Sequence, residues 1–166
     1  MMKLGVVGLA ALAVAPFPLG HAAAPRACLA LHLAARAAFE GGAGAEEGGI
    51  SLRNRSTSSC QVAGRAILEF VAGGRRLGVR NVVGKSTSGA RRGRAILLTP
   101  GDRAFVHARW SNWCGDRYQR VGLRVWIQTT DPKVPVKGTV APPRCDDPSV
   151  GSRVAVGPFE RIRHYP

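Results

Sequence analysis

The chain has 166 residues, of which 45% are hydrophobic and 20% are charged, a composition typical of one globular domain. Its 24 basic residues outnumber its 10 acidic residues and give a net charge of +14. These values exclude a large enzyme, a membrane bundle, a coiled coil and a disordered chain, whereas 21 glycines and 11 prolines favour a fold with many turns.

Residues 1–24 have the pattern of a secretory signal peptide. Lys3 precedes an uncharged run over residues 4–19, and the alanines at 22–24 supply small residues for cleavage. The run is shorter than the roughly 20 apolar residues that span a bilayer, so we expect no transmembrane segment; a buried N-terminal helix is the alternative. We predict a secreted or extracellular protein, with association to the cell envelope left open, and one domain over residues 25–166.

Beyond residue 25, a period of two residues predicts short strands separated by turns. Gly73-Gly74 and Pro100-Gly101 predict turns, the glycine-rich residues 41–49 predict a loop, and the alanine-rich residues 29–40 have a helix as their alternative. Strands of this number and spacing predict an all-β fold, an antiparallel β-sandwich. The strands are expected near residues 29–34, 50–54, 66–71, 76–83, 95–98, 104–110, 121–127, 134–140 and 153–156.

Four cysteines lie beyond the signal segment: Cys28, Cys60, Cys114 and Cys145. An even number of cysteines in an exported chain predicts two disulfides, with three possible pairings. Their wide spacing does not match a zinc site, and the residues before Cys28 do not match a lipid-attachment motif.

Arginine supplies 20 of the 24 basic residues. Arg53, Arg109 and Arg124 fall at outward strand positions, where guanidinium groups suit an anionic partner. The candidate partners are an anionic envelope polymer, lipid headgroups or a protein; the alternative is that the charge reflects composition and a solvated surface. No motif of sequence-specific nucleic-acid recognition accompanies the arginines, and we expect a monomer.

Several motifs follow one another in a distinctive order. Leu52-Arg53-Asn54 leads to Cys60, Leu98-Thr99-Pro100-Gly101 ends a strand, a strand with Trp110 precedes Cys114, and Cys145 precedes the closing strand at 154–156. In this order they resemble the exported actinobacterial family known as domain of unknown function 4232, over residues 28–159. The resemblance implies an immunoglobulin-like sandwich and an envelope or extracellular setting, and it implies no activity.

No motif predicts a catalytic, cofactor or metal site. Residues 84–87 lack the first glycine that a phosphate loop requires, and His32, His107 and His164 lack the spacing of metal ligands. The leading hypothesis is therefore a secreted, non-enzymatic binding module. The alternative is a secreted hydrolase whose site is assembled from His107 and loop carboxylates, for which the candidates are Glu69, Asp102, Asp116 and Asp131.

Strand directions predict which cysteines pair. If residues 50–54 run upward, alternation of the following strands makes residues 104–110 run upward too, which places Cys60 and Cys114 at the same end. An immunoglobulin-like fold would join them there, and Cys28 and Cys145 would then tie together the two ends of the domain. This pairing depends on the number of strands between residues 80 and 95, because one strand more or fewer would place Cys114 at the opposite end.

Overall fold

The computed structural model describes residues 25–42, 44–85, 94–127 and 133–162. In this part of the chain the structure is all-β apart from one 3₁₀ turn, and it contains no helix long and apolar enough to cross a membrane. The elements are η1 (Ala30–His32), β1 (Leu33–Gly42), β2 (Ala45–Asn54), β3 (Cys60–Val62), β4 (Ala66–Ala72), β5 (Arg75–Arg76), β6 (Arg80–Val83), β7 (Ile96–Leu98), β8 (Arg103–Ser111), β9 (Val121–Ile127), β10 (Val134–Val140) and β11 (Arg153–Arg161).

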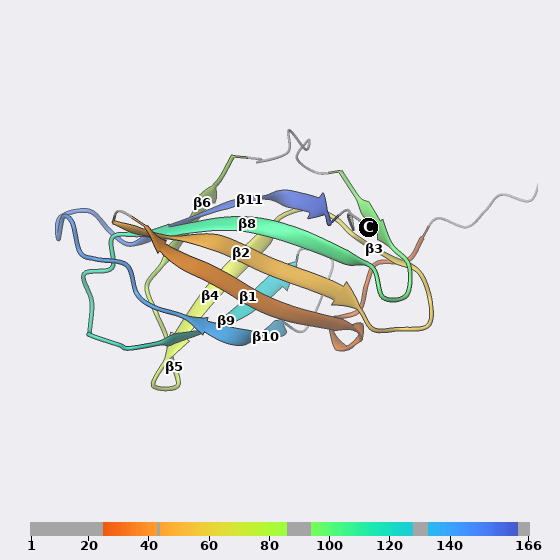
Figure 1. Ribbon diagram of the computed structural model, residues 1–166, viewed down its shortest axis with the longest axis horizontal. Coiled ribbons are helices and arrows are strands. Elements are labelled where there is room, and N and C mark those ends of the chain that lie inside the picture. Colours follow the sequence, from red (N-terminus) through yellow and green to blue (C-terminus); the bar gives the residue numbers. More distant parts are fainter. Residues whose placement is uncertain (1–24, 43, 86–93, 128–132, 163–166) are drawn as a thin grey trace, which may run out of the picture.

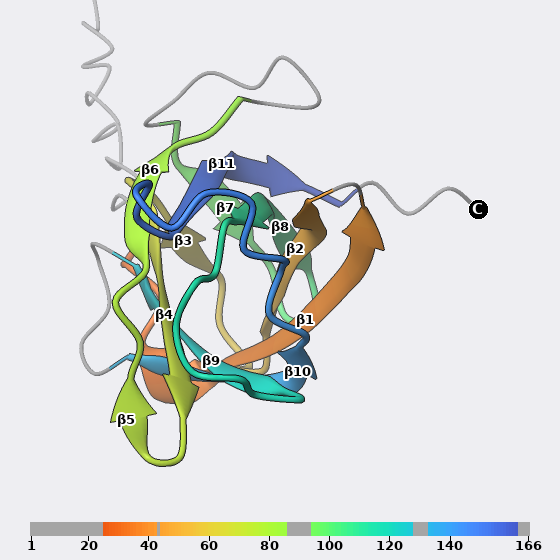
Figure 2. The ribbon, with the colours of Figure 1, turned by 90° about the vertical axis from the view of Figure 1, so that its left-hand side faces the viewer.

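Nine strands form one curled sheet in the order β5-β4-β9-β10-β1-β2-β8-β11-β6, and β3 pairs with β7 separately. Figure 1 shows β1, β2 and β8 lying side by side, and Figure 2 shows how the sheet curls until the arm with β4 faces the arm with β11. Most neighbours are antiparallel, as predicted, but β1 with β10 and β6 with β11 are parallel pairs. The antiparallel prediction is wrong for these pairs because a period of two residues is the same in both kinds of strand.

The hydrophobic core lies inside the curl. Along β8, Val106, Ala108 and Trp110 are fully buried, as the predicted alternation requires. Trp110 packs against Phe70 of β4, with 4.3 Å between the ring centroids. The two arms of the sheet therefore meet through aromatic side chains.

One side chain joins the last strand of the sheet to the opposite arm. Asn81 of β6 accepts a hydrogen bond from the backbone N–H of Leu68 and donates one to the Leu68 carbonyl, both at 2.8 Å. These are backbone groups of β4 that a neighbouring strand would otherwise pair with. We call this contact the Asn81 clasp.

The glycine-rich residues 41–49 lie largely within strands, because β1 ends and β2 begins in this stretch. A Cβ on Gly48 would lie 2.0 Å from the Ala38 carbonyl oxygen, and one on Gly49 would lie 2.1 Å from the Val106 carbonyl oxygen. Glycine is needed here because the backbones approach closely. The prediction of a long loop is therefore wrong.

The strand predicted at residues 29–34 begins only at Leu33, and the helix alternative is wrong. The η1 turn precedes β1 and is closed by a 3.0 Å hydrogen bond from the His32 N–H to the Leu29 carbonyl. Leu33 is buried, whereas Leu29 and Leu31 are 52% and 76% exposed. A turn does not keep alternate side chains on one face, so Leu29 and Leu31 do not join Leu33 in the core.

The return strand predicted at 76–83 is divided into β5 and β6. Arg75 and Arg76 complete the hairpin around the predicted Gly73-Gly74 turn, whose residues have φ of 54° and 75°. The chain then leaves β4, and β6 pairs with β11 instead. The predicted turn is confirmed, but the single return strand is not.

All four cysteines are in disulfides, as predicted, but the predicted pairing is wrong. Cys28 is joined to Cys60 and Cys114 to Cys145, with Cα–Cα distances of 4.8 and 4.7 Å. Each bond closes a separation of about 30 residues, and the two lie at opposite ends of the long strands. We call these the Cys28–Cys60 end and the Cys114–Cys145 end.

The error arises from one reversal of strand direction. Arg53, near the end of β2, is paired with Arg103, the first residue of β8, so β8 runs away from the Cys28–Cys60 end. The pairings give β6 the same direction as β2, as predicted. The short strand β7 does not run to the other end of the sheet, because Leu98 at its end lies next to Asn54 at the end of β2. The predicted alternation counted β7 as one full crossing too many, and the predicted direction of β8 is therefore reversed.

Candidate functional site

The outer surface of the curled sheet brings basic side chains together in opposed positions. Residues that are paired across neighbouring strands lie on the same face. All six basic residues concerned are exposed, and none forms an ion pair with an acidic residue of the described ranges. They are Arg36 with Lys137, Arg53 with Arg103, and Arg80 with Arg153, and we call them the basic face.

Four members of the basic face form a row over the adjacent strands β10, β1, β2 and β8: Lys137, Arg36, Arg53 and Arg103. Arg36 is opposite Ser51, so Arg53 is its diagonal neighbour. With strands about 4.8 Å apart, the row spans about 15 Å. Like charges in opposed positions destabilise a sheet by a few tenths of a kcal/mol to about 1 kcal/mol. An anion bound along the row would remove this repulsion.

The structure separates the three arginines that the sequence singled out. Arg53 belongs to the row, whereas Arg109 is paired with Glu47, with 2.9 Å between Nε and Oε1. Arg124 lies on β9, in the other arm, with its Nη1 3.5 Å from Oε1 of Glu69. All three side chains are on outward positions, as predicted, but they do not converge on one site.

Glu69 is a buried carboxylate surrounded by three cations. Lys133 donates a hydrogen bond to it, Arg124 lies at 3.5 Å, and the Nε of Arg76 is 3.7 Å away. The Lys133 hydrogen bond, followed by the charges of the three cations, lowers the pKa of Glu69 below its ordinary value. This carboxylate therefore stays ionised and helps to attach β10 and β9 to β4.

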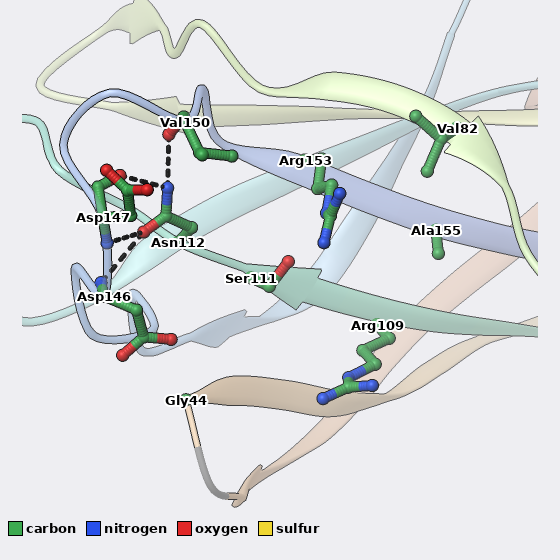
Figure 3. A pocket seen from close by; sticks show the side chains of 10 residues that line it. All are labelled: Gly44, Val82, Arg109, Ser111, Asn112, Asp146, Asp147, Val150, Arg153 and Ala155. Atoms are coloured by element: carbon green, nitrogen blue, oxygen red, sulfur yellow. Dashed lines mark hydrogen bonds between the residues drawn. The ribbon is translucent and has the colours of Figure 1, made fainter.

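A polar hollow of about 620 Å³ lies at the Cys114–Cys145 end of the same outer surface. Figure 3 shows Arg109 of β8 and Arg153 of β11 on one side, with Asp146 on the loop between β10 and β11. Arg153 also belongs to the basic face, so the hollow extends that face. The lining residues are Gly44, Val82, Arg109, Ser111, Asn112, Asp146, Asp147, Val150, Arg153 and Ala155.

Asn112 shapes this hollow by holding the loop beside it. Its side-chain oxygen accepts the N–H groups of Asp146 and Asp147 at 2.9 and 3.0 Å, and its amide donates to the carbonyls of Asp147 and Val150. Asn112 has a φ of 59°, a left-handed conformation that asparagine tolerates better than most residues. Together with the Cys114–Cys145 disulfide, it fixes the loop in place.

The residues considered for a hydrolase site are dispersed. Asp102 and His107 lie at the two ends of a five-residue interval, about 17 Å in an extended strand, and Glu69 is held by its three cations. Asp116 lies in the loop after β8, where its carboxylate accepts a hydrogen bond from the Tyr118 hydroxyl at 3.2 Å. Asp131 lies outside the described residues, as does His164, which was considered as a metal ligand. Within the described ranges no three His, Cys, Asp or Glu residues are grouped so that they could hold a metal ion.

Sequence reasoning missed the basic pairs Arg36/Lys137 and Arg80/Arg153, because each joins residues from distant segments through a parallel pairing. It also missed Asn112. The signal for Asn112 was weak: an asparagine directly after a strand and two residues before a cysteine is compatible with a turn, but nothing in the sequence shows which loop it holds.

The chain belongs to the family described as domain of unknown function (DUF4232), whose model matches residues 28–160. No curated protein and no solved structure matches the chain significantly. The family assignment confirms the family itself, domain of unknown function 4232, which the order of the motifs predicted, and adds no activity.

Proposed function

We propose that this protein is a non-enzymatic binding module that acts at the cell envelope or outside the cell, where its basic face holds an anionic polymer. The predicted signal peptide at residues 1–24 and the two disulfides support the location. The polymer is a chain of phosphodiester or carboxylate groups, because guanidinium groups pair with both in bidentate geometry.

The observation that carries the proposal is the set of three opposed basic pairs without acidic partners among the described residues. Other arginines of the sheet have such partners, as Arg109 does in Glu47 and Arg124 does in Glu69. A charge retained only for solubility has no reason to be placed opposite a like charge. A linear polyanion would contact several of the pairs at once, since they are distributed over six neighbouring strands of one surface.

The test is isothermal titration of the protein with long-chain polyphosphate and with heparin at low and at high salt. We expect binding that weakens steeply with salt concentration. The double variant Arg53→Ser/Arg103→Ser should bind at least about tenfold more weakly, because it removes two adjacent cations from the row.

The matched control is Arg65→Ser/Arg75→Ser, which makes the same change in net charge at two exposed arginines, one directly before β4 and one on β5, at the far edge of the sheet; neither forms an ion pair with an acidic residue of the described ranges. If the two double variants lose affinity equally, binding depends on net charge and the proposed face is wrong. Absence of binding to either polyanion at low salt would also reject the proposal.

The immunoglobulin-like sandwich implied by the family resemblance remains part of this proposal. The packing of Phe70 in β4 against Trp110 in β8 supports a description as two facing layers. The hydrolase alternative has less support, because Glu69 is held ionised by cations and its pKa is lowered rather than raised as a general acid requires.

A further inference from the structure

Exposed leucines gather at the Cys28–Cys60 end of the molecule, away from the centre of the basic face. Leu29 directly precedes η1 and Leu31 lies within it. Leu97 of β7 is paired with Gln61 of β3, and Gln61 forms a β-bridge with Ala27, two residues before Leu29. We call these three residues the leucine edge. Large apolar side chains exposed together mark a surface that contacts something other than water.

The turn that carries Leu29 and Leu31 is held firmly in place. Cys28 is bonded to Cys60, its N–H donates to the Gln61 carbonyl at 3.0 Å, and the Arg55 N–H donates to the His32 carbonyl at 2.8 Å. The exposure of the leucines is therefore a fixed property of the fold. Pre-organised apolar side chains lose little conformational entropy when they enter an apolar phase.

Two arginines lie in the chain segments next to the leucine edge. Arg26 precedes Cys28, and its carbonyl accepts the Gln61 N–H; Arg55 is bonded to the turn through its backbone. Both arginines are exposed, and neither forms an ion pair with an acidic side chain in the described part of the chain. Asp102 lies in the neighbouring turn, where its carboxylate accepts the N–H of Thr99.

We infer that the leucine edge inserts into the surface of an anionic lipid bilayer, with Leu29 and Leu31 below the headgroups and Arg26 and Arg55 at the level of the phosphates. Two exposed leucines with two exposed arginines in the neighbouring chain match a surface that is apolar inside and negative outside. They are too few for a protein interface, which buries about 800 Å² on each partner. This contact depends on the leucines, whereas polymer binding depends on the row of cations, whose Arg53 and Arg103 lie at the same end of the molecule.

The experiment is co-sedimentation of the exported protein with vesicles of phosphatidylcholine alone and of phosphatidylcholine mixed with phosphatidylglycerol. We expect binding only to the anionic vesicles. Leu29→Ser/Leu31→Ser should weaken it by about a hundredfold, because each leucine loses roughly tenfold in partitioning. The same variant should bind polyphosphate as the wild type does.

The control is Val150→Ser, which removes an exposed apolar side chain (41% exposed) at the opposite end of the molecule. It should leave vesicle binding unchanged. A thermal melt and a count of free thiols confirm that each variant is folded with its disulfides intact. Vesicle binding that survives loss of both leucines, or that falls equally in the control, overturns the inference. Polymer binding that fails while vesicle binding persists rejects only the proposed function.

Discussion

The Asn81 clasp offers the sharpest test of how the curled sheet is closed. Asn81→Ala removes two hydrogen bonds of 2.8 Å and leaves the N–H and carbonyl of Leu68 without partners at a buried position. An unpaired buried backbone group costs about 1–3 kcal/mol. Allowing for partial access of water at the strand edge, we expect a loss of about 2–4 kcal/mol in the free energy of unfolding.

For a domain of this size, such a loss lowers the Tm by about 6–16 °C. The measurement is thermal and urea unfolding followed by circular dichroism, with Trp fluorescence reporting on the packing of Trp110 between the two arms. The unfolding transitions measured by circular dichroism and by Trp fluorescence should coincide, because the clasp joins the two arms that enclose Trp110.

The control is Arg80→Ser, one residue earlier on β6. Its side chain is exposed and lies opposite Arg153, so its removal should be neutral or slightly stabilising. If Asn81→Ala changes the free energy of unfolding by less than about 0.5 kcal/mol, the clasp makes no net contribution, and the closure of the sheet rests on the core alone.

Three further predictions address the charges and the loop. Because the folded-state pKa of Glu69 is below its unfolded value near 4.5, its ionised form stabilises the fold above that pH, and this contribution disappears as the pH falls through the lowered value. Glu69→Gln should therefore be less stable than the wild type by about 1 kcal/mol at pH 7, and the difference should shrink steadily as the pH falls below 4.5, by urea unfolding. Arg103→Ser should raise the Tm by about 1–4 °C at low salt and by less at high salt, because it relieves the repulsion with Arg53; a decrease at low salt would contradict the electrostatic reasoning. Asn112→Ala should cost about 2–4 kcal/mol and expose the loop at residues 146–150 to faster hydrogen exchange, and an unchanged exchange rate there would show that the disulfide alone holds the loop.

The sequence predicted the local features of the fold because local features depend on neighbours along the chain. The alternation along β8 and β9 identified their buried faces, and Gly73-Gly74 and Pro100-Gly101 marked turns that the structure contains. The outward positions of Arg53, Arg109 and Arg124 followed from the same period. An even number of cysteines was sufficient to predict that all four are oxidised.

Features that join distant segments were decided by the tertiary structure. Arg53 lies opposite Arg103 because β8 is the strand next to β2. The residues of β2 alone do not determine which strand lies beside them, so the sequence could not show whether Arg53 has an acidic or a basic neighbour. Cys60 pairs with Cys28 because β8 begins where β2 ends, so that Cys114 is carried to the opposite end. The period of two residues is unchanged when a strand is reversed or paired in parallel, and this symmetry is why the sequence could define each strand but not the direction or partner of every strand.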